Sequence, residues 1–174
     1  MFVLKIIKKI FAILGSSDSP RQVAWGFALG MILGLTPFWS LHNLLIVFLI
    51  LLFHVNLGSA IFGWFLFSAF AYLLDPLFHS LGYYLLVQAE GLQSLWTFFY
   101  NHPVLALLRF NNTVVLGSLL ASLVLLVPTR YWMQWFVRYY RKHLQPKVQK
   151  IKIVQILKSS KIYTAYQKVK ILGA

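Results

Sequence analysis

Short apolar stretches divided by prolines, glycines and polar residues make up most of the chain up to residue 87. The first runs from Pro20 to Leu35 and cannot continue as a helix through Pro37. Its sixteen residues rise roughly 24 Å as a helix, less than the ~30 Å hydrocarbon core of a membrane. Residues 40–55 form a second stretch of similar length. Residues 20–55 therefore predict a short helical hairpin that either re-enters a membrane part-way or crosses a locally thin one.

The later apolar stretches are interrupted as well. Residues 57–87 predict two helical segments separated before Pro76. Residues 92–110 are aromatic and are expected to lie half-inserted in a membrane. Residues 113–127 predict a membrane span that ends at Pro128. The predicted fold class is therefore an all-α integral membrane protein with short or broken helical hairpins.

Amphipathic interfacial helices are predicted at both ends of the chain. Residues 1–15 place their lysines in one sector of a helix, and residues 129–145 place basic residues on one side and mainly aromatic residues on the rest. Between them, residues 16–128 form the predicted membrane domain, and residues 146–174 form a basic cytoplasmic tail. The basic residues expected at the membrane surface are Lys5, Lys8, Lys9, Arg130, Arg138, Arg141 and Lys142.

The sequence "SSDSPRQ" at residues 16–22 is typical of a helix start. Ser19 is in position to cap the helix and Pro20 to occupy its first turn, where a missing N–H costs nothing. Gln22, three residues after Ser19, completes a capping box. We therefore expect a new helix to begin at Pro20.

Composition supports a membrane location. The 174 residues are 60% hydrophobic and 11% charged with a mean hydropathy of +0.74, whereas about a quarter of the residues in a soluble domain are charged. The 16 Lys and Arg give a net charge of +13, yet none lies between Gln22 and Leu108. The positive-inside rule then predicts a multi-pass protein with both termini cytoplasmic. No nucleic-acid-binding motif is present, so no nucleic-acid partner is expected, and the chain has no cysteine.

Three glycines, Gly26, Gly30 and Gly34, recur every four residues and form one stripe on a helix. Small residues allow membrane helices to approach closely, which favours a packing role. An alternative is that the stripe lets a short helix slide or lets a lipid chain pass. Further candidates for helix packing are Gly63, Gly117 and Ala121.

Interrupted apolar segments also suggest a polar recess, because unpaired backbone groups in a membrane need protein or water around them. The alternative is that the prolines only kink the helices. Asp75 and His79 are spaced to meet on one helix face as a proton relay, but Asp75 is also well placed as a helix cap. Arg109 could bind the phosphate of a lipid headgroup, or it could extend its side chain to the membrane interface. The candidate lipid-binding or cavity-lining residues are Arg21, Pro37, His42, Asn56, Asp75, His79 and Arg109.

Catalysis has little support in the sequence. The chain has 3 acidic residues, no cysteine, and no Ser-His-acid order in a recognisable context. Its histidines lack the spacing of metal ligands. We therefore expect no enzyme activity, no metal and no cofactor.

The stretches "SPRQVAWGFALGMILGLTPFWSLHNLL", "HVNLGSAIFGW" and "DPLFHSLGYYLL" resemble the bacterial membrane family called domain of unknown function 2062, in its small stand-alone hydrophobic branch. The resemblance covers roughly residues 17–130, and Trp39 with Ser40 and Asp75 depart from it, standing where a glycine and an asparagine are usual. The positions that carry it are Ser19, Pro20, Gly26, Gly30, Pro37, His42, Asn56 and Pro76.

The resemblance implies a protein of bacteria with an outer membrane, paired with a large periplasmic AsmA-like protein that bridges the two membranes. We therefore expect an inner-membrane subunit that handles membrane phospholipid and anchors or feeds this periplasm-spanning lipid conduit. Two alternatives remain. One is a small-solute transporter or channel acting as a homo-oligomer, and the other is a passive membrane anchor or assembly factor.

Overall fold

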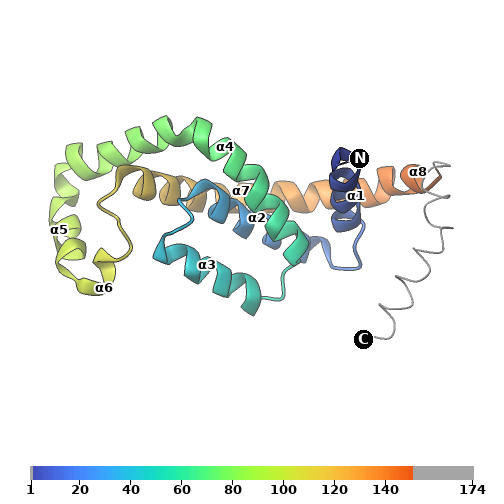
Figure 1. The fold of residues 1–174 in the computed structure, drawn as a ribbon, viewed down its shortest axis with the longest axis horizontal. Coiled ribbons are helices and arrows are strands. Elements are labelled where there is room, and N and C mark those ends of the chain that lie inside the picture. The colour runs from blue at the N-terminus through green and yellow to red at the C-terminus, as the bar shows by residue number, and fades with distance from the viewer. Residues whose placement is uncertain (1, 151–174) are drawn as a thin grey trace. The chain divides into compact units, whose positions relative to one another are not determined.

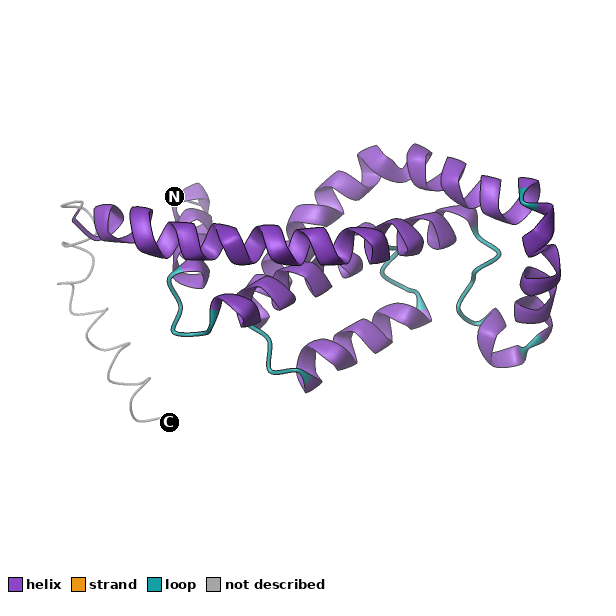
Figure 2. Cartoon of the chain, turned by 180° about the vertical axis from the view of Figure 1, so that it is seen from behind, coloured by secondary structure: helices purple, strands orange, loops and turns teal. Residues whose placement is uncertain are grey.

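The computed structural model describes residues 2–150, and all of their regular elements are helices (Figures 1 and 2). The all-α class is therefore confirmed for this part of the chain. The chain divides into two compact units, residues 1–137 and 138–174. The elements are α1 (Phe2–Leu14), α2 (Pro20–Leu35), α3 (Leu41–Leu52), α4 (Leu57–Tyr83), η1 (Tyr84–Gln88), η2 (Glu90–Leu92), α5 (Gln93–Asn101), α6 (Pro103–Ala106), α7 (Thr113–Tyr139), η3 (Tyr140–Leu144) and α8 (Gln145–Lys150).

Helix α2 begins as its capping sequence predicts. The Ser19 hydroxyl accepts a bond of 3.2 Å from the Gln22 amide, and the Gln22 side chain accepts one of 2.8 Å from the Ser19 amide. The helix ends at Leu35, before Pro37. Of its 16 residues, 12 are buried, including both the apolar residues and the glycines. A helix buried on nearly every side is the centre of the fold.

The glycine stripe of α2 lies against α4, which runs beside it in the same direction (Figure 1). A Cβ on Gly30 would come within 2.1 Å of the Ala60 carbonyl oxygen, and one on Gly34 within 2.6 Å of the Trp64 carbonyl oxygen. From the other side, a Cβ on Gly63 would come within 2.5 Å of the Phe27 carbonyl oxygen. The two backbones are thus in direct contact, which only residues without a Cβ permit.

Helix α3 runs back along the hairpin, so that the end of α3 lies near the start of α2. The Gln22 side chain donates to the His54 carbonyl (3.2 Å), and the Asn56 amide donates to the Gln22 carbonyl (3.3 Å). The other end of α2 is beside Ser68, whose amide nitrogen lies 2.9 Å from a Cβ placed on Gly34. Ser68 is eleven residues into α4, or about 16 Å along it. The turn of the hairpin therefore lies beside the middle of the longer helix.

The break expected before Pro76 is wrong, because α4 runs without interruption through Asp75 and Pro76 to Tyr83. A proline removes a single backbone bond, and the helix curves instead of ending (Figure 1). The turns that follow Pro76 are held by packing, since Phe78 is buried and Gly82 lies against the Thr113 carbonyl.

Helix α7 likewise runs on through Pro128, where the sequence predicted an end, and Figure 2 shows it as one uninterrupted helix. It runs antiparallel to α4, since a Cβ on Gly117 would meet the Phe78 carbonyl and one on Gly82 the Thr113 carbonyl. Ala121 packs beside the buried Met31, Leu35 and Phe78. Packing on both sides of Pro128 keeps the helix intact.

Residues 84–112 form a tip that joins the far ends of α4 and α7 and contains η1, η2, α5 and α6 (Figure 1). The tip forms a half-open cavity of about 290 Å³, lined mainly by aromatic and aliphatic side chains that include Trp96, Phe99 and Phe110. The Trp96 indole donates to the Leu85 carbonyl at 2.8 Å and ties α5 to η1. The stretch 92–110 thus folds into short helices.

In the second unit, the described residues 138–150 continue as helix. The rings of Tyr139 and His143 stack with centres 4.7 Å apart, one turn from each other. Most of the basic tail predicted for residues 146–174 lies outside the described residues.

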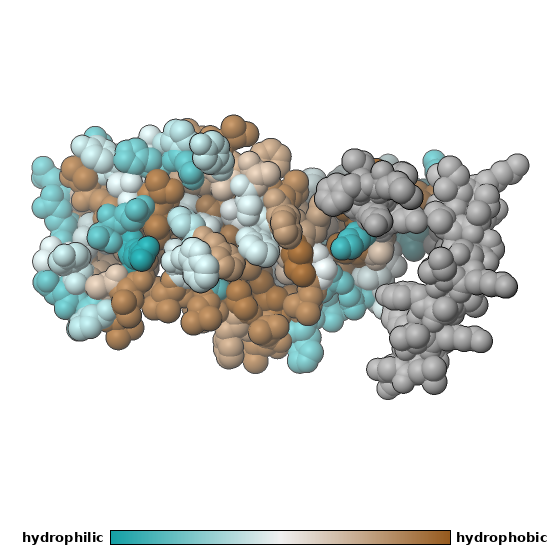
Figure 3. Space-filling model, in the orientation of Figure 1, coloured by the Kyte–Doolittle hydropathy of each residue, from teal (hydrophilic) through white to brown (hydrophobic). Residues whose placement is uncertain are grey.

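Within residues 2–150, two helices are long and apolar enough to cross a membrane, namely Leu57–Gln88 and Thr113–Val148. Their apolar windows are largely exposed, with 17% and 33% of the residues buried. Helix α3 is a shorter apolar helix, and its outer face is also exposed, with Leu44 67% and Leu51 65% exposed. Figure 3 shows this apolar surface as a brown area over α3 and its neighbours, with more polar residues toward the tip.

Candidate functional site

The turn between α2 and α3 is built around two buried polar side chains. The Thr36 hydroxyl lies 2.8 Å from both the Ile32 carbonyl oxygen and Asn43 Oδ1. The Asn43 amide group donates to the carbonyls of Pro37 (3.0 Å) and Phe38 (3.3 Å). These bonds satisfy backbone carbonyls that have no helical partner where the chain reverses, and they fix the conformation of the turn.

Ser40 and His42 in the same turn are also buried, but they lack partners. Each is 7% exposed, and neither the Ser40 hydroxyl nor either ring nitrogen of His42 has a hydrogen-bond partner in the described residues. A neutral imidazole offers one donor and one acceptor, and burying such groups unpaired costs about 1–3 kcal/mol each. Unpaired buried groups of this kind are typical of places that receive a polar ligand or water.

His42 occupies the first turn of α3, on the face that also carries the buried Ile46 and Ile50. These two pack against Leu29, Ile32 and Leu33 of α2. Since a helical Cα–Cβ bond tilts toward the N-terminus, the ring lies over the start of α3, where the helix dipole is positive. The structure therefore brings an imidazole and a hydroxyl to a helix N-terminus whose Ser40 makes no capping bond.

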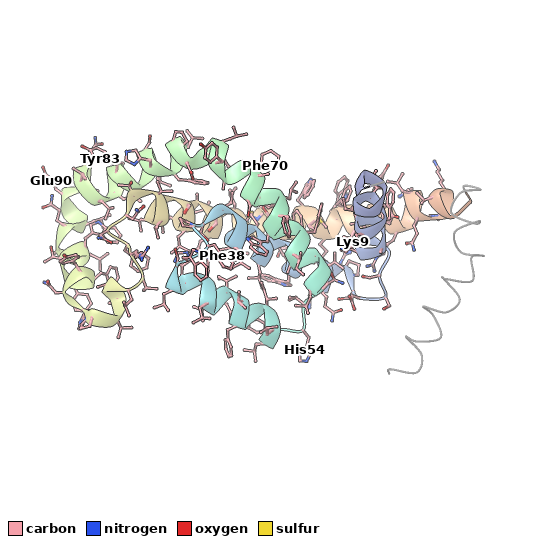
Figure 4. The ribbon with its side chains drawn as sticks, in the orientation of Figure 1. Lys9, Phe38, His54, Phe70, Tyr83 and Glu90 are labelled. Atoms are coloured by element: carbon pink, nitrogen blue, oxygen red, sulfur yellow. The ribbon has the colours of Figure 1, made fainter. Side chains whose placement is uncertain are left out.

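The aromatic residues of the turn lie on its outer side. Phe38 stacks on Trp64 of α4 with ring centres 5.3 Å apart, whereas Trp39 is 86% exposed. Pro37 is exposed as well. Figure 4 shows Phe38 at the turn and His54 at the opposite end of α3.

At that opposite end, Asn56 has a structural role. Its side chain caps α4 by accepting from the Ser59 amide (2.6 Å) and donates to the Asp18 carboxylate. The Ser59 hydroxyl donates to the Val23 carbonyl at 2.7 Å. Asn56 thus joins the starts of α2 and α4, and Arg21 is exposed nearby in the first turn of α2. Sequence reasoning missed Asp18 and Ser59 as its partners.

The other predicted polar residues lie away from the hairpin turn. Asp75 is inside α4 and therefore does not cap a helix. His79 Nδ1 lies 2.7 Å from the Thr113 hydroxyl of α7, and no hydrogen bond joins His79 to Asp75. Arg109 is exposed in the loop before α7, with a φ of 54°. Its carbonyl accepts from the Asn112 amide (3.0 Å), whose side chain caps α7. The predicted lining residues are thus spread over several places.

Arg130, one of the residues expected at the membrane surface, is buried within the protein, where it is 9% exposed. Its guanidinium carbon lies 5.4 Å from the centre of the Trp25 ring and 4.3 Å from that of Tyr131. Arg130 Nε and the side-chain oxygen of Gln134, one turn further along α7, are buried without a partner in the described residues. Helix α7 continues through Pro128, so this residue faces α2.

The other basic residues expected at a membrane surface are more accessible where they are described. Lys9, Arg138 and Lys142 are exposed, and Arg141 is half-buried. The side chains of Lys5 and Lys8 lie outside the described ones. Among the described residues, no group of three or more His, Asp or Glu is arranged to hold a metal ion.

A family model described as "Uncharacterized protein conserved in bacteria (DUF2062)" matches residues 5–145. The chain belongs to this family. A relative of similar length occurs in Treponema pallidum (strain Nichols), where it carries the name "Uncharacterized protein". It is 26% identical over 158 residues, which cover 91% of this chain and 97% of the relative. No solved structure matches the chain.

Several of the positions that carry the family resemblance have a clear structural role. Ser19 and Pro20 start α2, and Gly26 and Gly30 allow contact with α4. Asn56 caps α4. His42, by contrast, has no hydrogen-bond partner among the described residues that would explain it structurally. We therefore regard the turn that holds His42 and Ser40 as the candidate functional site.

Proposed function

We propose that this protein is a bacterial inner-membrane subunit that takes up phospholipid at the turn of a re-entrant hairpin and feeds a periplasm-spanning lipid transport protein. In this proposal α4 and α7 cross the membrane, α2 and α3 enter and leave on the cytoplasmic side, and both termini are cytoplasmic. The lengths of Leu57–Gln88 and Thr113–Val148 and their exposed apolar faces support two crossings.

The distribution of charge supports the orientation. Lys9 and Arg21 precede or begin α2, and Arg138 and Lys142 follow the apolar part of α7. The tip at residues 84–112 contains Arg109 as its single Lys or Arg. Basic residues stay on the cytoplasmic side, so the ends of the chain are cytoplasmic and the tip is periplasmic.

The observation that carries the proposal is the position of the hairpin turn. The turn lies about 16 Å along α4, roughly half the ~30 Å thickness of the hydrocarbon core. Polar backbone at that depth is tolerated where protein surrounds it or where it lines a cavity. Asn43 and Thr36 satisfy the turn from inside, and the unpaired Ser40 and His42 provide groups for a lipid headgroup.

A lipid entering from the cytoplasmic leaflet would keep its chains against the outer face of α3, which is apolar and exposed. Its headgroup would meet the hydroxyl, the imidazole and the positive end of the α3 dipole. Helix α1 carries Lys9, which would hold this helix at the same leaflet by attraction to anionic lipid. Such an attraction contributes about 1 kcal/mol per basic residue.

The periplasmic partner is proposed from the resemblance to proteins paired with a large AsmA-like bridge. The tip at residues 84–112 is the part that such a partner would reach, because it lies at the end of α4 away from α2. Its aromatic cavity would accept an apolar segment of the partner or a lipid chain in transit.

Single cysteines introduced into a chain that has none test the topology. We expect Ser17→Cys and Phe53→Cys to react with a membrane-impermeant maleimide from the cytoplasmic side and Asn111→Cys from the periplasmic side. Labelling of Phe53→Cys from the periplasm would mean that the hairpin crosses, and the proposal would fail. Affinity purification of the natively expressed protein should recover a large periplasmic protein and phospholipid together, and recovery of neither would also overturn it.

A further inference from the structure

The buried guanidinium of Arg130 has no counter-charge among the described residues. It lies between the Trp25 ring of α2 and the Tyr131 ring of its own helix, at 5.4 Å and 4.3 Å. Aromatic faces attract a cation but do not satisfy its N–H donors. Arg130 Nε has no hydrogen-bond partner in the part of the chain that the structure describes, although the residue is only 9% exposed. A buried charge in this state needs an anion.

A second unpaired polar group accompanies it. Gln134 follows Arg130 by one helical turn, so both side chains lie on the same face of α7. The Gln134 side-chain oxygen is buried and has no partner within residues 2–150. Met133 and Val137 on this part of α7 are buried against the protein. An anion that carries hydroxyl donors would therefore satisfy both residues, with the guanidinium holding its charge and Gln134 accepting from a hydroxyl.

The depth of Arg130 agrees with a lipid headgroup. Trp25 is five residues into α2, about 8 Å from the end of the helix that the proposed topology places at the cytoplasmic surface. Trp132 and Trp135 point outward at this level, 55% and 59% exposed, as tryptophans do at a membrane interface. The proposed topology places the phosphate diesters of the cytoplasmic leaflet at the same level.

We infer that Arg130 and Gln134 form a site for a phosphate diester with a hydroxylated headgroup, at the cytoplasmic end of the membrane domain. This inference rests on the proposed function for its membrane setting alone. The guanidinium binds two phosphate oxygens as a fork, with Trp25 and Tyr131 fixing its plane. The site lies near the base of α2 and is separate from the turn that holds His42.

The test uses the purified full-length protein, stripped of lipid in detergent, with short-chain probes. Dihexanoyl-phosphatidylglycerol carries the phosphate and hydroxyls, inorganic phosphate carries the charge alone, and dihexanoylglycerol carries neither charge nor phosphate. Binding is read by native mass spectrometry and by the shift of the thermal unfolding midpoint. We expect phosphatidylglycerol to bind and stabilise, and dihexanoylglycerol to do neither.

The variants assign the effect to the site. Arg130→Met should abolish the stabilisation, and it should raise the unfolding midpoint without lipid because an unpaired buried charge is removed. If Arg130→Met does not fold, Arg130→Lys keeps the charge but not the fork and should bind at least tenfold more weakly. Gln134→Leu should reduce the preference for phosphatidylglycerol over phosphatidylethanolamine of the same chain length. Arg138→Gln removes an exposed charge and serves as the matched control, with binding unchanged.

Stabilisation by phosphatidylglycerol but not by inorganic phosphate supports a lipid as the source of the diester, and equal stabilisation by both supports a free phosphate at the same site. Binding that Arg130→Met and Arg130→Lys leave unchanged, or no binding of either probe, overturns the inference. None of these measurements needs a periplasmic partner or a particular path of the hairpin. Failure of the proposed function would therefore leave a positive result at Arg130 intact.

Discussion

Gly30 lies so close to Ala60 that a Cβ on Gly30 would come within 2.1 Å of the Ala60 carbonyl oxygen. The obstacle is backbone, so no side-chain rotation relieves it. We expect Gly30→Ala to force α2 and α4 apart and to lower the free energy of unfolding by about 1–3 kcal/mol, the usual cost of overpacking. Thermal unfolding in detergent measures the loss.

Gly91 provides the control for this prediction, because a Cβ there would meet nothing within 4 Å. We expect Gly91→Ala to leave the unfolding midpoint unchanged or slightly raised, since alanine restricts the unfolded chain. Equal losses for the two variants would mean that the contact between α2 and α4 does not require glycine.

Asn56 is the residue through which the hairpin is joined to α4. It caps the helix through Ser59 and also bonds to Asp18. We expect Asn56→Ala to cost about 0.5–2 kcal/mol for the cap alone and more for the lost bond to the carboxylate. The free energy of unfolding should fall accordingly, with greater proteolysis of the segment between α3 and α4. Asn101→Ala, at an exposed position in α5, should have no comparable effect.

Much of the hairpin was predictable because its signals are local. Ser19 and Gln22 are three residues apart, and Pro37 follows the last residue of α2 by two positions. Asn56 is also of a residue type that favours a helix cap, and it caps α4, although it is predicted to line a cavity. Where a helix begins or ends is often set by a few neighbours in the chain.

Pro76 and Pro128 show where local signals fail. Each predicted a break, yet both helices continue because buried residues such as Phe78 and Met133 hold the turns that follow. The burial of Arg130 could not be predicted for a related reason. A helical wheel groups the residues on one face but does not say which face meets the protein, and the partner Trp25 is distant in sequence. Only the tertiary packing supplies this information.

Because α4 continues through Pro76, this proline is expected to weaken the helix. Alanine at position 76 restores an amide that can donate to the Tyr72 carbonyl, four residues earlier. We expect Pro76→Ala to raise the free energy of unfolding by up to about 3 kcal/mol and to straighten α4. Pro20→Ala, in the first turn of α2, restores no helix bond and should change stability much less. A loss of stability in Pro76→Ala would instead mean that the curvature of α4 is needed for its packing.

Replacing His42 tests whether this residue of the hairpin turn has a structural or a functional role. Its ring is buried, and neither ring nitrogen has a partner in the described residues. If the imidazole served packing alone, leucine would be a poor substitute for a planar ring and would lower stability. If it is kept for a ligand, His42→Leu removes an unpaired polar group and should raise the free energy of unfolding by about 1–3 kcal/mol. The same variant should retain less phospholipid on purification, measured by mass spectrometry. The exposed His102→Leu should change neither quantity, and a destabilised His42→Leu that still retains its lipid would contradict the assignment of the turn as the lipid site.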